Sequence, residues 1–96
     1  MAVIQTAAES NEPLLRVAAA SGMRNLPSRQ AAKVLESLKD DQDVGVRKVM
    51  LKSAGHFRSR EIAAKLKLMS KSDPEESIRD LAATTAAEMR KPKEES

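Results

Sequence analysis

The stretch QDVGVRKVMLKS, residues 42–53, decides the fold, because its pattern occurs once before it and once after it in the chain. The matching stretches are NEPLLRVAAASG at 11–22 and DPEESIRDLAATT at 73–85. Each contains an apolar residue followed by arginine, and successive pairs lie 31 and 32 residues apart: Leu15-Arg16, Val46-Arg47 and Ile78-Arg79. A nearly fixed period of this length indicates a repeated structural unit.

Apolar side chains recur within each stretch at the spacing of one helix face. Counted from the apolar member of the pair, the third and fourth following residues are apolar and the seventh is small in all three stretches. These positions are Ala18, Val49 and Leu81, then Ala19, Met50 and Ala82, then Gly22, Ser53 and Thr85. The stripe predicts three amphipathic helices of one kind, whose small residues let a neighbouring backbone come close.

A second kind of helix alternates with the first. SRQAAKVLESLKDD at 28–41 matches SREIAAKLKLMSKSD at 59–73, and Ser28 and Ser59 stand where a helix N-cap is expected. The expected helices are 2–9, 13–23, 28–39, 44–55, 59–71 and 74–90. We therefore predict an all-α domain over residues 1–90, in which helical hairpins stack as a short α-solenoid of about five helices plus a short N-terminal helix. Residues 91–96 are expected to form a disordered charged tail.

Composition narrows the class of protein. The chain has 96 residues, enough for one small domain, and no cysteine, which excludes disulfides and thiolate metal sites. No signal peptide or membrane-spanning run stands at the N-terminus, so a cytoplasmic protein without a membrane partner is expected. The net charge is +3, but residues 47–71 carry eight basic side chains against Glu61 alone, a net of +7. Such a segment attracts anionic partners.

These residues resemble the HEAT-repeat family, in the manner of its short bacterial-type α-solenoid repeats. Its second helix opens with an acidic turn and a Val-Arg pair, as at Asp41, Asp43 and Val46-Arg47 and again at Asp73, Glu75 and Ile78-Arg79; Ser10, Glu12 and Leu15-Arg16 match it less closely. The resemblance covers residues 3 to 90. It implies a structural ladder in which aspartate and arginine of successive repeats bridge one another, formed by Asp41, Arg47, Asp73 and Arg79.

Other repeat families fit less well, although the period here is shorter than the HEAT period of about 40–47 residues. This chain lacks the Thr-Pro-Leu-His motif of ankyrin repeats. It also lacks the tryptophan and tyrosine that tetratricopeptide repeats need. The segment from Leu26 to Leu35 also resembles the helical repeats of flagellar motor-switch proteins and of the cytoplasmic domain of magnesium transporters. That resemblance covers one helix and leaves the all-α prediction unchanged.

Motifs for catalysis or metal binding are weak. His56 is the only histidine, and we expect it to be a polar group near a helix C-terminus rather than a proton-transfer residue. A calcium loop starting at Asp41 would need glycine at its sixth position and glutamate at its twelfth, where valine and lysine stand. The acids at 40, 41 and 43 therefore fit helix capping. We expect no enzyme activity, no cofactor and no metal site.

The leading functional hypothesis is a non-catalytic protein-interaction module or scaffold whose partner is another protein, acidic in character. The residues expected to bind it are Lys48, Leu51, Lys52, Arg60, Lys67 and Lys71; Leu51 is the one bulky apolar residue at a repeat position, shared with Ala20 and Ala83, that is predicted to be exposed. The alternative is a helical repeat protein that binds nucleic acid through residues 47–71, as in the HEAT-like DNA-alkylation repair proteins. The apolar residues Val3 and Ile4 further suggest self-association, or a longer parent chain, at the N-terminal end.

Overall fold

The computed structural model describes residues 2–89, and the side chains from residue 4 onward. Within that range the chain forms six α-helices, one short 3-10 helix and no strand. Their bounds are α1 Ala2–Ala8, α2 Pro13–Gly22, η1 Met23–Asn25, α3 Ser28–Leu38, α4 Val44–Ala54, α5 Arg60–Ser72 and α6 Glu76–Met89. The all-α prediction is confirmed, and each expected helix is found with its ends shifted by two residues or fewer. The expected tail at 91–96 and the side chain of Val3 lie outside what is described.

Side-chain caps mark some of the helix starts. Asp43 precedes α4 and its Oδ1 accepts a hydrogen bond from the Gly45 N–H at 2.8 Å, while Ser59 precedes α5 and its Oγ accepts one from the Ile62 N–H at 3.2 Å. The cap expected at Ser28 is wrong. Pro27 occupies that position with an extended backbone, so Ser28 is already the first helical residue and its side chain makes no cap bond.

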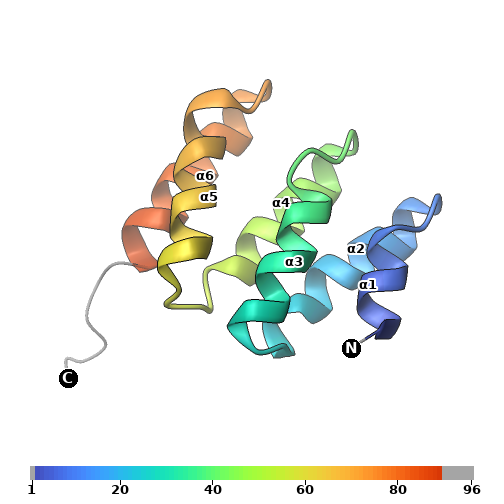
Figure 1. The fold of residues 1–96 in the computed structure, drawn as a ribbon. Coiled ribbons are helices and arrows are strands. Elements are labelled where there is room, and N and C mark those ends of the chain that lie inside the picture. The colour runs from blue at the N-terminus through green and yellow to red at the C-terminus, as the bar shows by residue number, and fades with distance from the viewer. Residues whose placement is uncertain (1, 90–96) are drawn as a thin grey trace.

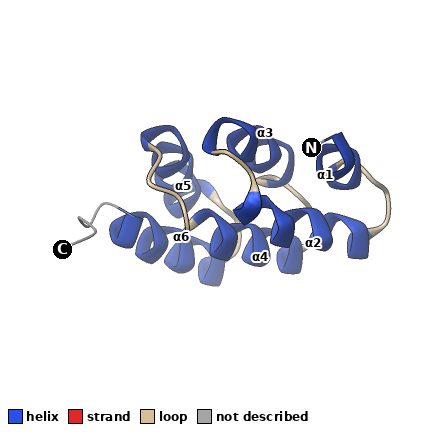
Figure 2. Cartoon of the chain, turned by 90° about the horizontal axis from the view of Figure 1, so that it is seen from below, coloured by secondary structure: helices blue, strands red, loops and turns tan. Residues whose placement is uncertain are grey.

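The helices lie in two layers. Figure 2 shows α1, α3 and α5 in one layer and α2, α4 and α6 in the other. Consecutive helices pack as the pairs α1–α2, α3–α4 and α5–α6, and within each layer every helix also contacts the next one. Figure 1 shows these pairs following one another from the N-terminus toward the C-terminus. The overall extents of 39 × 29 × 16 Å describe a slab about two helix diameters thick, since packed helices lie about 8–10 Å apart.

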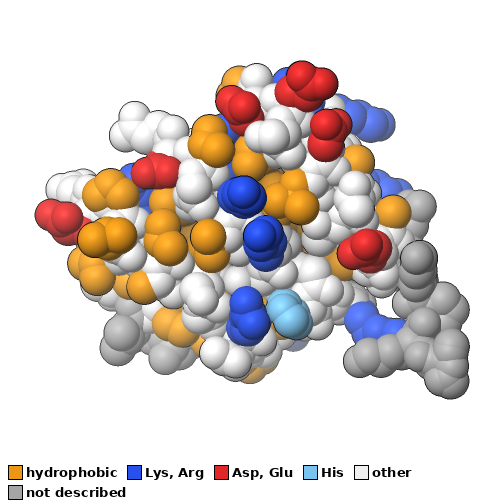
Figure 3. Space-filling model, turned by 180° about the vertical axis from the view of Figure 1, so that it is seen from behind, with side chains coloured by type: hydrophobic (Ala, Val, Ile, Leu, Met, Phe, Trp, Pro, Cys, Tyr) orange, Lys and Arg blue, Asp and Glu red, His pale blue; other side chains and the backbone are white. Residues whose placement is uncertain are grey.

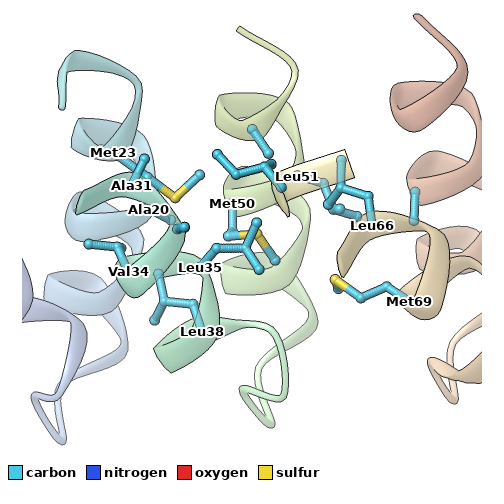
Figure 4. Packing of buried hydrophobic residues seen from close by; sticks show 14 of the residues in the cluster. Ala20, Met23, Ala31, Val34, Leu35, Leu38, Met50, Leu51, Leu66 and Met69 are labelled. Atoms are coloured by element: carbon cyan, nitrogen blue, oxygen red, sulfur yellow. The ribbon is translucent and has the colours of Figure 1, made fainter. Parts of the chain in front are cut away.

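The core fills the space between the layers. Among the residues whose burial is described it contains 20 buried apolar side chains, of which eight are alanine, so the helix backbones approach one another closely. Figure 4 shows side chains from α3, α4 and α5 meeting there. The small residues of the repeat serve this approach: Ser53 is fully buried, and a Cβ added to Gly22 would lie 3.2 Å from Cδ1 of Ile4.

The predicted exposure of Leu51 is wrong, because this side chain is 0% exposed. It lies in the core with Leu66 of α5 (Figure 4). The side chain at this position of the repeat faces the following helical pair. The equivalent Ala20 is therefore also buried, whereas Ala83, in the last pair that the structure describes, is exposed. Burial at this position therefore depends on whether another helical pair follows.

On the side of α2, α4 and α6 that faces the preceding helical pair, the pattern of burial is reversed. Val46 and Ile78 are buried where their helices meet the preceding pair, but the equivalent Leu15 is 49% exposed, because α2 belongs to the first described pair and no described helix of its layer lies on that side. An apolar edge is thus left at the N-terminal end of the described fold. None of the helices formed by residues 2–89 is long and apolar enough to cross a lipid bilayer.

Candidate functional site

Arginine and aspartate side chains link successive helical pairs. Nε of Arg16 lies 2.6 Å from Oδ2 of Asp41, and its Nη2 donates to Oδ1 at 3.2 Å. One pair further on, Nε of Arg47 lies 2.8 Å from Oδ2 of Asp73, and its Nη2 donates to Oδ1 at 3.1 Å. For Arg16 both contacts are hydrogen bonds, which fixes the guanidinium plane as well as the charge, whereas for Arg47 only Nη2 donates a hydrogen bond and Nε is in ion-pair contact alone. Equivalent residues therefore join the first pair to the second and the second to the third.

The same arginines also hold the turn that precedes their own helix. Nη1 donates to the carbonyl oxygen six residues earlier in each case: Arg16 to Ser10 at 2.9 Å, Arg47 to Asp41, and Arg79 to Asp73 at 2.7 Å. Arg79 has no carboxylate partner within residues 2–89. These contacts explain the arginine positions by packing and by turn geometry.

The observed ion pairs differ from the ladder of Asp41, Arg47, Asp73 and Arg79 that the family resemblance implies, because Arg16 takes part and Arg79 does not. Asp41 pairs with the side chain of Arg16, and Arg47 reaches Asp41 only through the backbone carbonyl. The sequence signal for Arg16 was its place in the Leu15-Arg16 pair. Asp41 and Asp73 additionally accept a hydrogen bond from the N–H two residues later, at 2.9 Å in both turns.

The basic residues expected to bind a partner separate into two groups. Lys48 and Lys52 are exposed on α4, whereas Arg60, Lys67 and Lys71 are exposed on α5, in the other layer. None of the five forms an ion pair within the described part of the chain. The structure does not bring them together on one surface.

Lys65 belongs to the same charged segment but has a local partner. Its Nζ lies 2.8 Å from Oε1 of Glu36 on α3, and this hydrogen bond is the main reason that the pKa of Glu36 lies below its usual value, although burial acts in the opposite direction. Lys39 adds a favourable charge 3.8 Å from Oε2. The Glu36–Lys65 ion pair links α3 to α5, so it accounts for Lys65 by a contact within the fold.

A leucine that the sequence hypothesis left out is the most exposed large apolar residue described. Leu14 of α2 is 81% exposed. Its equivalents in the repeat are Gly45 and Ser77, and the position lies on the same helix side as Lys48 and Lys52 do on α4. The signal available in the sequence was a bulky side chain where the other two repeats have small ones.

We call this outer side of α2, α4 and α6 the even-helix face. It is defined by the exposed residues Leu14 and Ala18 on α2, Lys48 and Lys52 on α4, and Asp80 and Thr84 on α6. Figure 3 views the molecule from this side, with hydrophobic side chains gathered over the N-terminal part and basic side chains in the middle. Its character therefore changes from apolar to basic to acidic along the row of helices.

Titratable groups elsewhere form no recognisable reaction centre. His56 follows α4 and is exposed, and its imidazole has no hydrogen-bond partner in the described range. No group of three or more His, Asp or Glu side chains within residues 2–89 is placed to hold a metal ion. Asp43 caps α4, and Asp40 lies 2.8 Å from Nζ of Lys39.

Four of the concave regions that border the described residues differ in the charge of their linings. Three of them involve the acidic turns around Asp41 and Gln42. The fourth, of about 480 Å³, lies between the start of α5 and the end of α6 and has three basic side chains in its lining. Comparison of the chain with protein-family models, with curated proteins and with solved structures finds no match.

Proposed function

We propose that this chain is a non-catalytic protein-interaction module, built as a short α-solenoid of HEAT-like hairpins, and that it binds its partner on the even-helix face. The proposal of a solenoid is supported by the repeated helical pairs and by equivalent Arg–Asp contacts between them. Each further pair in such an array adds a parallel helix to the same face, which is how these architectures build extended binding surfaces.

The observation that carries the binding site is the exposure of Leu14 on the same face as Lys48 and Lys52, two lysines that form no ion pair with any described residue. A leucine side chain removed from water contributes about 1.5–3 kcal/mol, whereas an exposed charge contact contributes about 0.2–1 kcal/mol. Leu14 would therefore supply affinity, and Lys48 and Lys52 would supply orientation toward carboxylates. A protein segment with an apolar side chain flanked by acidic residues fits this surface.

A photo-crosslinking experiment tests the proposal. A photoreactive amino acid is introduced at Leu14 in one variant and at Leu68 in the other, since Leu68 is also strongly exposed, at 67%, but lies on α5 in the opposite layer. A protein captured at position 14 and not at 68, whose capture is lost on Lys48→Glu and Lys52→Glu substitution, supports the site. Equal capture at both positions would remove it.

The nucleic-acid alternative makes a different prediction on the same residues. Binding to duplex or single-stranded oligonucleotides would fall steeply with salt, because each phosphate contact releases counterions. The division of the basic side chains between two layers limits the number of phosphates that one strand can contact at once. Affinity for an oligonucleotide at low ionic strength that is lost with Lys48→Glu, and no protein partner at position 14, would favour this alternative.

A further inference from the structure

The cavity at the C-terminal end of the helix rows has a more uniform charge than the other three concave regions described above. Its lining consists of Arg58, Ser59, Arg60, Ala63, Ala64, Lys67 and Met89, with no acidic side chain among the described residues. Its volume of about 480 Å³ lies within the ordinary range for ligand sites, about 300–1,000 Å³. Basic groups surround an apolar floor there, and the even-helix face contributes none of its residues.

The start of α5 adds hydrogen-bond donors at the edge of this cavity. Ser59 caps the helix by accepting from the Ile62 N–H, and its backbone carbonyl accepts from Ala63. The backbone N–H groups of Arg60 and Glu61 have no acceptor within residues 2–89. Helix N-termini favour anions because such N–H groups and the helix dipole both point outward.

Two of the basic side chains lie one above the other along α5. Arg60 and Lys67 are seven residues apart, which is close to two helical turns, or about 10 Å. Ala63 and Ala64 lie between them on the same side, and Met89 faces them from the end of α6. This spacing suits two carboxylates separated by a small number of residues, with an apolar side chain over the alanines.

We propose that this cavity, the α5–α6 groove, is a second docking site and that it takes a short acidic peptide segment containing a bulky apolar residue. Charge complementarity selects that occupant: the charged side chains among the described lining residues are all basic, and they belong to the segment 47–71 of net charge +7. The apolar floor selects against a purely ionic ligand. This site is independent of the even-helix face, because it lies at the start of α5 and the end of α6.

The test uses the full chain, isotopically labelled, and the synthetic peptide acetyl-Glu-Glu-Leu-Glu-Glu-amide, followed by NMR. The expected result is a saturable shift of the methyl signals of Ala63, Ala64 and Met89. Arg60→Gln and Lys67→Gln should each weaken binding by about fivefold, the size of one exposed charge contact. Lys71→Gln is the matched control, because Lys71 is exposed on the same helix but does not line the groove.

Two further arms make the outcome decisive. A peptide in which every glutamate is replaced by glutamine should not bind. The Leu14→Asp substitution should leave binding of the original peptide unchanged, so that the two docking sites are judged separately. Shifts confined to the even-helix face, an equal effect of Lys71→Gln, or no shift at low ionic strength would each overturn the proposal.

Discussion

Arg47 and Asp73 form a nearly dehydrated ion pair between α4 and the turn that leads into α6, with their side chains 7% and 2% exposed. The aspartate is satisfied on two sides, because its Oδ1 also accepts from the Glu75 N–H at 2.9 Å. Buried charges are stable only when each has its partner. The contact therefore fixes the position of the α5–α6 pair relative to the α3–α4 pair.

Replacement of Asp73 should be the most damaging change in the ladder. Asp73→Ala leaves the guanidinium of Arg47 buried without a carboxylate, which is expected to cost about 3 kcal/mol or more of unfolding free energy. Arg79→Ala serves as the comparison, because Arg79 bonds only to a backbone carbonyl and should cost about 1 kcal/mol. Urea denaturation measures both, and equal losses would contradict the importance assigned to the ion pair.

The two leucines whose exposure differs most give a test of the packing. Leu51→Ala removes a fully buried side chain and should destabilise the fold by about 2–5 kcal/mol, through lost burial and the cavity left behind. Leu14→Ala should change stability by less than about 0.5 kcal/mol, since Leu14 is largely solvated. Thermal and chemical unfolding of the two variants distinguish them. A small effect at Leu51 would mean that it is not in the core.

The two serines that occupy the same place in the sequence repeat should differ on replacement. Ser59→Ala removes the hydrogen bond to the Ile62 N–H and is expected to cost about 1 kcal/mol. Ser28→Ala removes no cap bond, because Pro27 stands at the cap position of α3, and should be nearly neutral. Unfolding midpoints of the pair provide the measurement, and a larger loss at Ser28 would run against the cap assignment.

The Glu36–Lys65 contact should be visible in acid titration. Because the folded-state pKa of Glu36 is lowered, chiefly by the hydrogen bond from Lys65, the stability that it contributes is present above the ordinary glutamate pKa of about 4.3. That contribution is lost as the pH falls through the lowered value. The Lys65→Gln variant should raise the pKa toward the ordinary value, as followed by carboxyl carbon NMR, while Lys52→Gln should not change it. The stability effect at neutral pH should stay below about 1 kcal/mol, since the pair is partly exposed.

Sequence periodicity was sufficient to predict the helices, but it was not sufficient to predict which of their side chains are exposed. The stripe containing Met50 correctly identified residues that face the core, because helical spacing alone determines which side chains share a face. It could not distinguish Leu15 from Val46, which have the same place in the repeat but different neighbours. For the same reason the periodicity could not show that Leu51, an expected binding residue, is buried. Leu14 was overlooked because the adjacent Leu15 is the residue that fits the repeated apolar stripe.

The amino-acid order by itself determined that this chain is helical, where its helices begin and end to within two residues, and which arginines recur in step with the repeat. Those properties follow from local backbone preference and from the spacing of side chains along one helix. Only the tertiary structure decided which repeats are flanked on both sides, and hence that Leu51 is buried, that Leu14 is exposed and that the basic residues fall into two groups. Burial and charge proximity depend on contacts between helical pairs, which a residue's position within its own helix does not specify.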